Sequence, residues 1–422
     1  MTELPRAWRS ARLAEVCEVV SGGTPKTGVA AYWDGDIPWV TPKDLSLDKR
    51  QVLHGGARSI TREGLANSSA KLFPAGSVIV SSRAPIGYVA IAGEPMSTNQ
   101  GCKIAVPPSE IDSRFLYWYL LQAKHDMDAR ASGTTFKEIS GKEFGRTLLR
   151  WPTLGEQRRI VEILEDHLSR LVATARGLAL AGRRLDQMRI SALMAALQAA
   201  EHPGARRQMS FGTLRFAVPD AWEASTVGAM SEVVEYGSGA KAHSESGPGR
   251  VPVLRMGNVK GGALIWDSLK YLPTGHPDVV RLRLAPGDLL FNRTNSAEHV
   301  GKSAVFHGER DATFASYLIR VRFNSAVNPI WASRVINSPL GRQFVSSVVS
   351  QQVGQANVNG SKLRAFPLPV PPRAEQDAIV SNLAELDDAA QRLKVQLEVA
   401  RGKSGSLRRS LLAAAFSGRL VS

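Results

Sequence analysis

The sequence predicts an α+β protein in which two pseudo-repeated globular blocks, each mixed but largely β, are joined by two long helices that form an intramolecular coiled coil. The first observation is a proline-free segment over residues 154–198 whose apolar positions have helical spacing. The second is a similar segment that begins near residue 373. The third is that strand, loop and helix signals occur in the same order before each segment.

The first long helix is expected within residues 153–203. About 45 residues of helix span roughly 65–70 Å at about 1.5 Å per residue, which is far longer than a typical globular helix. An isolated amphipathic helix is not stable in water, so its apolar stripe must pack against a partner. The stripe consists of Leu164, Leu168, Leu171, Ala175, Leu178, Gly182 and Leu185.

The partner of this helix lies in the same chain, within residues 373–422. The opening Glu156-Gln157 of the first segment returns as Glu375-Gln376, at an offset of 219 residues. The same fixed offset aligns the apolar positions of the two segments, so we expect them to pair. The stripe of the second helix consists of Ile379, Leu383, Leu386, Ala390, Leu393, Leu397, Ala400, Ser404, Leu407 and Leu411.

Residues 1–152 are expected to form the first globular block. Short apolar runs alternate with loops marked by glycine and proline, which is typical of strands connected by turns. Trp8, and Trp222 in the second block, are expected to be core residues, and one helix is expected over residues 114–122. The expected strands cover residues 77–81, 88–91, 102–106 and 148–152.

Residues 204–372 are expected to form the second block, which repeats the order of the first. Residues 286–291 match residues 75–80 at an offset of 211, and residues 292–293 then match residues 82–83 at an offset of 210. The offset drifts within the blocks but stays fixed along the helices. The loops therefore vary in length while the helical scaffold does not, as expected when loops carry specificity.

The charge of the chain indicates a polyanionic partner. Lys and Arg number 53 against 38 Asp and Glu, which gives a net charge of +15. An excess of this size favours nucleic acid first, although a basic protein without such a partner stays open. The excess is spread through folded-looking sequence rather than gathered in a tail, which argues against a simple electrostatic anchor.

Other compositional features narrow the class of protein. The two cysteines, Cys17 and Cys102, are too few for a disulfide framework or a thiolate metal site. No apolar run approaches the roughly 18 residues of a membrane span, and residues 1–6 have no signal-peptide core. We therefore expect a soluble cytoplasmic protein without a membrane partner.

The paired motifs before the two helices resemble those of the specificity subunit of type I restriction-modification enzymes. One copy is Pro-Thr-Leu-Gly-Glu-Gln-Arg-Arg-Ile-Val at 152–161, and the other is Pro-Pro-Arg-Ala-Glu-Gln-Asp-Ala-Ile-Val at 371–380. Two copies at the same place in two repeats are a specific signal. The openings at Trp8 and Trp222 and the Gly-Gln-Ala-Asn-Val run at 354–358 support the resemblance, which covers nearly the whole chain.

This resemblance implies that each block is a target recognition domain that reads one half of a split sequence in double-stranded DNA. It implies that the two helices pair antiparallel and set the gap between the halves. The subunit is expected to recruit two methyltransferase subunits and, through the complex, two restriction subunits. It is expected to have no catalytic residue, metal or cofactor of its own, because S-adenosylmethionine, ATP and Mg²⁺ belong to the partner subunits.

Motifs for independent chemistry are incomplete. The triplet at 301–303 ends like a phosphate-binding loop, but the position that requires glycine is Ser296. The triplet at 402–404 does not complete this motif either, because Leu397 occupies the position that requires glycine. The eight histidines show no ligand spacing typical of zinc. Two alternatives stay open: a self-contained DNA-modifying enzyme, which would need such a site, and a scaffold that binds only proteins.

Candidate DNA-reading residues lie in polar loops. Arg favours guanine and Asn or Gln favours adenine. Arg83 and Arg293 are the preferred pair because they follow matched strands, although either could contact phosphate instead of a base. The alternative for each candidate is a solvated turn or a side chain that bonds its own backbone. The candidates are Thr41, Lys43, Ser82, Arg83, Asn99, Thr134 and Lys137 in the first block, and Arg255, Asn258, Lys260, Asn292, Arg293, Asn295, Gln355 and Asn357 in the second.

Overall fold

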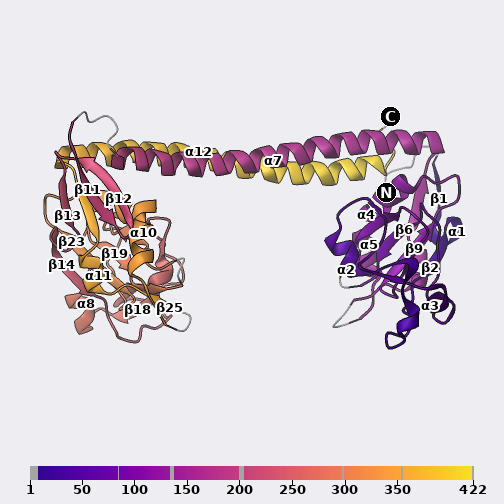
Figure 1. The fold of residues 1–422 in the computed structure, drawn as a ribbon, viewed down its shortest axis with the longest axis horizontal. Coiled ribbons are helices and arrows are strands. Elements are labelled where there is room, and N and C mark those ends of the chain that lie inside the picture. The colour runs from indigo at the N-terminus through magenta and orange to yellow at the C-terminus, as the bar shows by residue number, and fades with distance from the viewer. Residues whose placement is uncertain are drawn as a thin grey trace. The chain divides into compact units, whose positions relative to one another are not determined.

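A computed structural model of the chain shows two compact units (Figure 1). Unit 1 comprises Met1–Leu178 and Glu398–Ser422, and unit 2 comprises Ala179–Leu397. Each unit contains one globular block and a segment of each long helix, which confirms the predicted fold class. The structure describes residues 8–83, 85–133, 137–198, 204–296, 299–352 and 355–420.

The two long helices are α7, Leu154–Gln198, and α12, Arg373–Ala415. They begin at or beside the expected boundaries at 153 and 373, but the two compact units divide both helices. Ion pairs fix their direction in unit 2. Asp186 of α7 pairs with Lys394, and three residues later Arg189 pairs with Asp387. Residue numbers rise along one helix and fall along the other, so the helices are antiparallel there.

The apolar stripes of the helices are buried only in part. Leu164 and Leu168 of α7 are 0 % and 7 % exposed. The expectation was wrong for Ala175, Leu393 and Leu407, which are exposed. Two helices in contact bury only a narrow seam, and residues at the sides of the stripe stay outside it. Much of the apolar surface of the helices is therefore not covered within the chain.

Unit 1 is built on a five-stranded sheet with the order β2-β9-β6-β7-β4 and a three-stranded sheet with the order β5-β3-β8. All four residues of β6 are buried, because this strand lies between two others and carries a continuous apolar run. The strands of the first sheet are β2 Glu18–Ser21, β9 Cys102–Val106, β6 Val78–Ser81, β7 Val89–Ala92 and β4 Val52–Leu53. Those of the second are β5 Arg58–Ile60, β3 Trp33–Val40 and β8 Ser97–Thr98, and β1 Arg9–Arg12 pairs with β10 Leu148–Trp151.

The helices of unit 1 are short apart from the long pair. The one expected over residues 114–122 is present as α4, Ser113–Gln122, and packs in the core through Phe115, Leu116 and Leu120. The strands expected at 77–81, 88–91, 102–106 and 148–152 are present to within a residue or two as β6, β7, β9 and β10. The other helices are α1 Leu13–Val16, η1 Ala30–Tyr32, α2 Pro42–Leu47, α3 Arg62–Ala66, α5 Lys124–Arg130 and α6 Gly141–Gly145.

Unit 2 repeats this architecture. Its main sheet has the order β14-β23-β19-β21, and a second sheet has the order β18-β15-β22. These strands are β14 Ser231–Tyr236, β23 Leu318–Phe323, β19 Leu289–Asn292, β21 Ser303–Val305, β18 Lys270–Pro273, β15 Arg250–Leu254 and β22 Thr313–Phe314. Smaller pairings join β13 Glu223–Thr226 to β26 Pro367–Val370, β11 Arg206–Phe211 to β12 Leu214–Pro219, β16 Val259–Lys260 to β17 Ala263–Leu264, and β25 Gln355–Asn357 to β20 Thr294–Asn295 and β24 Ser350–Gln352.

The strand pairings confirm the internal repeat. In both units the second sheet contains a parallel pair, β3 with β8 in unit 1 and β15 with β22 in unit 2. The helix α9, Pro329–Asn337, stands where α4 stands in unit 1, as predicted from the sequence. The remaining helices of unit 2 are η2 Met256–Asn258, α8 Pro277–Arg281, α10 Pro339–Val348 and α11 Gly360–Arg364.

The repeated Glu-Gln motif joins each block to its long helix. In unit 1 the Gln157 amide is fully buried. Its Nε2 donates to the Glu110 carbonyl at 2.9 Å and the Pro152 carbonyl at 3.0 Å, and its Oε1 accepts from the Asp112 amide at 2.8 Å. The neighbouring Glu156 accepts from the indole Nε1 of Trp8 at 3.2 Å.

Unit 2 has the same joint. Nε2 of the buried Gln376 donates to the carbonyls of Ala326 and Pro371, both at 2.8 Å, and its Oε1 accepts from the Asn328 amide at 2.8 Å. Glu375 accepts from the indole of Trp222 at 3.2 Å. Trp8 and Trp222 are 8 % and 0 % exposed, which confirms them as core residues. The motif therefore holds the long helix against both the preceding strand and the loop before α4 or α9.

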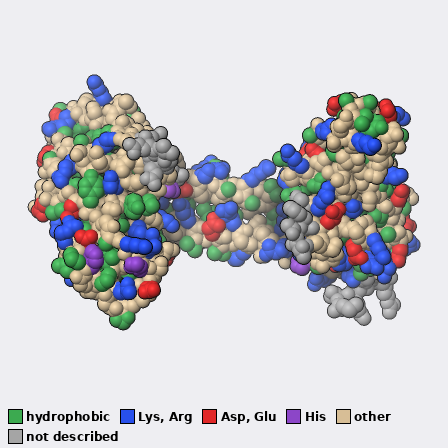
Figure 2. Space-filling model, turned by 90° about the horizontal axis from the view of Figure 1, so that it is seen from below, with side chains coloured by type: hydrophobic (Ala, Val, Ile, Leu, Met, Phe, Trp, Pro, Cys, Tyr) green, Lys and Arg blue, Asp and Glu red, His purple; other side chains and the backbone are tan. Residues whose placement is uncertain are grey.

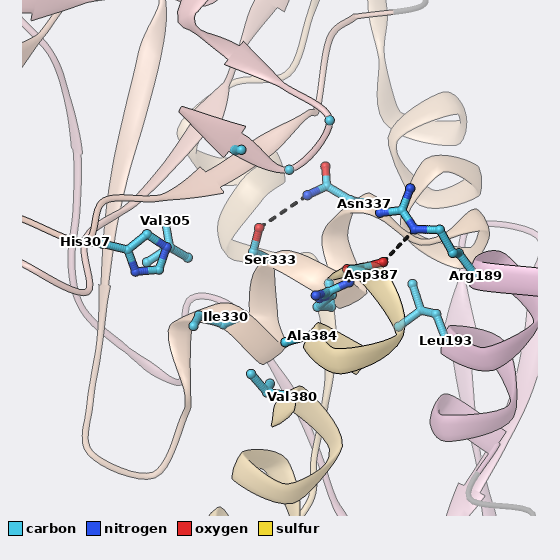
Figure 3. Close-up of a pocket in the computed structure, with 14 residues that line it drawn as sticks. Arg189, Leu193, Val305, His307, Ile330, Ser333, Asn337, Val380, Ala384 and Asp387 are labelled. Carbon is cyan, nitrogen blue, oxygen red and sulfur yellow. Dashed lines mark hydrogen bonds and ion pairs between the residues drawn. The ribbon is translucent and has the colours of Figure 1, made fainter. Parts of the chain in front are cut away.

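A second contact between block and helices surrounds a cavity of about 400 Å³ in unit 2 (Figure 3). The Asp387 carboxylate of α12 lies between Arg189 of α7 at 2.6 Å and Arg334 of α9 at 2.5 Å. Burial alone would raise the pKa of Asp387, but the two arginines lower it below its ordinary value. The ionised carboxylate thus ties three helices together.

Candidate nucleic-acid interface

Polar loops gather at one edge of the main sheet in each unit. In unit 2 the amide of Arg293, just after β19, donates to the Tyr317 carbonyl at 3.1 Å, just before β23. The Gly237 amide, just after β14, donates to the Leu318 carbonyl at 3.3 Å. These strands are antiparallel, so their loops meet at the same edge. We call residues 236–238, 255–258, 292–296 and 315–317 the loop edge of unit 2.

Unit 1 has the equivalent edge. The Ser82 amide, just after β6, donates to the Gly101 carbonyl at 2.7 Å, just before β9. The Asn99 amide donates to the Val40 carbonyl at the end of β3 at 3.0 Å. We call residues 21–24, 41–44, 82–83 and 99–101 the loop edge of unit 1. Most of the candidates named from the sequence of the first block lie on it.

Two candidates of unit 1 stabilise the loops in which they lie. The Thr41 hydroxyl donates to the Asp44 carboxylate at 2.6 Å and caps the N-terminus of α2. Oδ1 of Asn99 accepts from the Gly101 amide at 2.9 Å. Both side chains therefore shape the edge, in keeping with the local bonding expected of these residue types. Lys43, which lies between Thr41 and Asn99 in the sequence, is exposed.

A charged cluster stands at the end of β6. Ser82 is buried, and its hydroxyl lies 3.5 Å from a Glu138 oxygen. Arg83 and Lys103 lie 3.7 and 3.9 Å from the same carboxylate. Burial lowers the pKa of Lys103, and its neighbour Glu138 opposes that shift. Glu138 was not among the sequence candidates, because nothing local marks it as the partner of residues more than 30 positions away. Lys137 is exposed beside it, and Thr134 lies outside the described residues.

The amide side chains of unit 2 are mostly engaged with the backbone. Asn258 is 3 % exposed, and its Nδ2 donates to the carbonyls of Ile265 and Asp267 at 2.8 and 2.9 Å. Its Oδ1 accepts from the Arg255 amide at 2.9 Å, and a guanidinium nitrogen of Arg255 donates to the Ser268 carbonyl at 2.8 Å. These two candidates therefore stabilise the conformation of the loop after β15.

The candidates near β20 are also engaged within the protein. Oδ1 of Asn295 accepts from the Ser296 amide at 2.8 Å, and Nδ2 of Asn357 donates to the Thr294 hydroxyl at 3.0 Å. Asn292 is fully buried, with its Nδ2 3.5 Å from the Met256 carbonyl. Lys260 is exposed at the end of β16. Gln355 lies in β25, and its side chain is outside the description.

The register of the sheets corrects one sequence alignment. Ser81 lies opposite Cys102, the first residue of β9, and Asn292 lies opposite Leu318, the first residue of β23. The offset therefore stays at 211, and Arg293 is equivalent to Ser82 rather than to Arg83. The expected match of Arg83 with Arg293 is wrong. A slip of one residue turns a side chain to the opposite face of a strand, so the two arginines are placed differently.

Basic side chains are distributed over both units of this chain, whose net charge is +15. Figure 2 shows Lys and Arg side chains scattered over the visible face of each unit, with acidic side chains between them. Within the described part of the chain, no group of three His, Cys, Asp or Glu residues could hold a metal ion. A search of the same residues finds no helix long and apolar enough to cross a membrane.

Comparison with known proteins shows which proteins this chain is similar to. A family model for the type I restriction modification DNA specificity domain matches residues 5–178 and 219–399. The MjaIX specificity subunit of Methanocaldococcus jannaschii is 37% identical over 165 residues, which cover 38% of each chain. The EcoKI specificity subunit of Escherichia coli is 24% identical over 432 residues, which cover 99% of this chain and 90% of the relative.

Solved structures share the fold at low sequence identity. The HsdS subunit from Thermoanaerobacter tengcongensis has a TM-score of 0.62 at 19% identity, covering 99% of this chain and 98% of that one. A chain from a study of assembly and conformational transition of the type I R-M system has a TM-score of 0.71 at 18% identity, with both chains covered completely. Since the matched domain occurs twice, once in each unit and each time running into a long helix, the chain belongs to the family of type I restriction-modification specificity subunits.

Proposed function

We propose that this chain is the non-catalytic DNA-recognition subunit of a type I restriction-modification complex, in which each block reads one half of a split target. The observation that carries the proposal is the pair of loop edges. Two units of the same fold present polar loops at equivalent positions, but with different side chains. Such an arrangement suits two different half-sites read by one chain.

Exposed lysines in or beside these loops suit contacts to the DNA backbone. Lys43, Lys137 and Lys260 are exposed and have no ion-pair partner among the described residues. Lysine is a point charge that neutralises phosphate without reading sequence. We assign these three residues to phosphate contacts that orient each block on the duplex.

The long helices have two roles in this proposal. Their lengths of 45 and 43 residues set the gap between the half-sites. They also carry exposed apolar side chains, which in soluble proteins mark protein interfaces. We assign this surface to two methyltransferase subunits, with restriction subunits joining through the complex. The exposed residues, each 42% to 56% accessible, are Val172, Leu180, Met188, Ile190, Leu393, Val395, Val399 and Leu407.

The chemistry belongs to the partners in this proposal. The methyltransferase subunits would use S-adenosylmethionine to methylate adenine, and restriction subunits would use ATP and Mg²⁺ for cleavage. This chain would supply sequence choice and assembly. The test is a map of methylated adenines in the host genome with the gene present and with it deleted.

Loss of methylation at a motif with two halves and a fixed gap is the expected result. An insertion of four residues within 171–185 should then change the gap and leave both halves unchanged. If no adenine mark depends on the gene, the proposal fails. Binding of purified chain to duplex DNA then separates the alternatives: affinity should fall steeply with salt for a DNA reader, whereas a protein-only scaffold would not bind.

A further inference from the structure

The two loop edges carry different side chains at four equivalent positions. In unit 2 these positions hold Tyr236, Met256, Arg293 and Tyr317. Tyr236 is the last residue of β14, and Met256 is the first residue of the turn after β15. Arg293 and Tyr317 are joined by the backbone hydrogen bond described above. Tyr236, Met256 and Tyr317 are 43%, 37% and 47% exposed, so a large apolar surface faces outward beside one arginine.

The same positions in unit 1 hold small or neutral residues. Ser21 ends β2 as Tyr236 ends β14. Pro42 follows Thr41, whose backbone amide donates to the side chain of Asp44. Met256 likewise follows Arg255, whose backbone amide donates to the side chain of Asn258. Ser82 and Gly101 share the backbone bond that Arg293 and Tyr317 share in unit 2. The backbone is thus equivalent at these four positions, whereas the side chains differ.

Arg293 is held in a defined orientation but keeps donors available. Its guanidinium carbon lies 4.8 Å from the centre of the Tyr236 ring. This cation–π contact uses the face of the guanidinium. Because Nε is buried, the donors left for a base edge are those of Nη1 and Nη2. Nη1 makes one long contact of 3.4 Å to the Ser316 carbonyl, and Arg293 forms no ion pair with a described residue. Arg83, by contrast, shares the Glu138 carboxylate with Lys103.

From this geometry we infer that unit 2 reads a guanine through Arg293, and that unit 1 has no equivalent contact. A guanidinium fork donates two parallel hydrogen bonds to O6 and N7 of guanine in the major groove, and other bases do not offer that pair of acceptors. The exposed rings and the thioether supply apolar surface around the base edge. The inference rests on the proposed function and adds which base class one unit selects.

The test maps methylated adenines in the host with Arg293→Ala, Arg293→Lys or Arg310→Ala in the chromosomal gene. Arg310 is the matched control, because its guanidinium also stacks on an aromatic ring, that of Trp266, at 4.5 Å. Arg310 lies in the loop after β21, at the end of the sheet opposite to Arg293, because β19 and β21 are antiparallel. Arg293→Ala should make a single G·C position in one half degenerate. Discrimination there should fall roughly 5- to 150-fold, the range for one bidentate contact.

The other variants separate base reading from charge and from folding. Arg293→Lys keeps the charge but lacks the fork, so it should relax the same position while most methylation elsewhere in the motif is retained. Arg310→Ala should leave the motif unchanged. An unchanged motif in Arg293→Ala, a relaxed position that is not G·C, or the same relaxation in Arg310→Ala would overturn the inference. These outcomes differ from failure of the proposed function, in which deletion of the gene leaves every adenine mark in place.

Discussion

Replacing Gln376 by alanine is expected to destabilise unit 2 by about 3–5 kcal/mol. The side chain is fully buried and makes three hydrogen bonds of 2.8 Å to the backbone, with Ala326, Asn328 and Pro371. Alanine lacks the amide, so it leaves all three backbone groups without this hydrogen-bond partner. The bonds to Asn328 and Pro371 are buried, and each group left unsatisfied costs about 1–3 kcal/mol, whereas the partly buried bond to Ala326 contributes less.

Two further variants separate hydrogen bonding from packing. Gln376→Glu keeps the size of the side chain and the acceptor for the Asn328 amide, but it places a carboxylate against two carbonyl oxygens. It should therefore be at least as harmful as alanine. Gln391→Ala changes an exposed residue of the same helix, and its effect should stay within about 0.5 kcal/mol.

The assay is denaturant unfolding combined with hydrogen exchange read by mass spectrometry, which assigns the loss of protection to one unit. Gln157→Ala breaks the equivalent three bonds in unit 1, so the two variants should destabilise different units. A loss below about 1 kcal/mol for Gln376→Ala, similar to Gln391→Ala, would refute the reasoning that the amide holds the joint.

Two other predictions concern charged groups. Asp288 is fully buried and bonds both Arg320 and Arg322, so Asp288→Asn should cost about 3–5 kcal/mol in denaturant unfolding. Asp311→Asn, in an exposed pair, should change stability by less than about 1 kcal/mol, and equal effects would contradict the argument. Burial raises the pKa of Glu165, but hydrogen bonds from Arg114, Trp118 and Gln51 lower it below its ordinary value of 4.5. A lowered folded pKa stabilises the protein above about pH 4.5, and this contribution is lost as the pH falls through the folded value. Unfolding of Glu165→Gln should therefore depend less on pH in that acidic window, and an unchanged pH profile would contradict the assignment.

Much of the fold could be predicted from the sequence, because helix periodicity and repeats are local patterns. The spacing of apolar residues placed α7 at the bounds that the structure has, and the repeated Glu-Gln motif located both joints. Buried strands such as β6 and β9 were recognisable as apolar runs between turn residues. The motif did not reveal its own role, since the backbone groups that Gln157 holds include one 47 residues away.

The candidate site could be predicted only as a set of loops. Asn258 and Asn99 have the residue type that reads adenine, but the structure places their amides on the backbone of their own loops. Residue type does not distinguish these uses, because the same donors serve both. Glu138 beside Arg83 could not be foreseen either, since their proximity depends on a non-local bridge.

The sequence by itself determined that two similar blocks precede two matched long helices in a basic chain, because these properties are read from composition and short-range spacing. Only the tertiary structure decided which residues of the two blocks are equivalent. Strand register is fixed by hydrogen bonds between distant segments, and a shift of one residue changes the face to which a side chain points. That register makes Arg293 equivalent to Ser82 rather than to Arg83. One unit therefore has a half-buried arginine and two exposed aromatic rings where the other has small side chains.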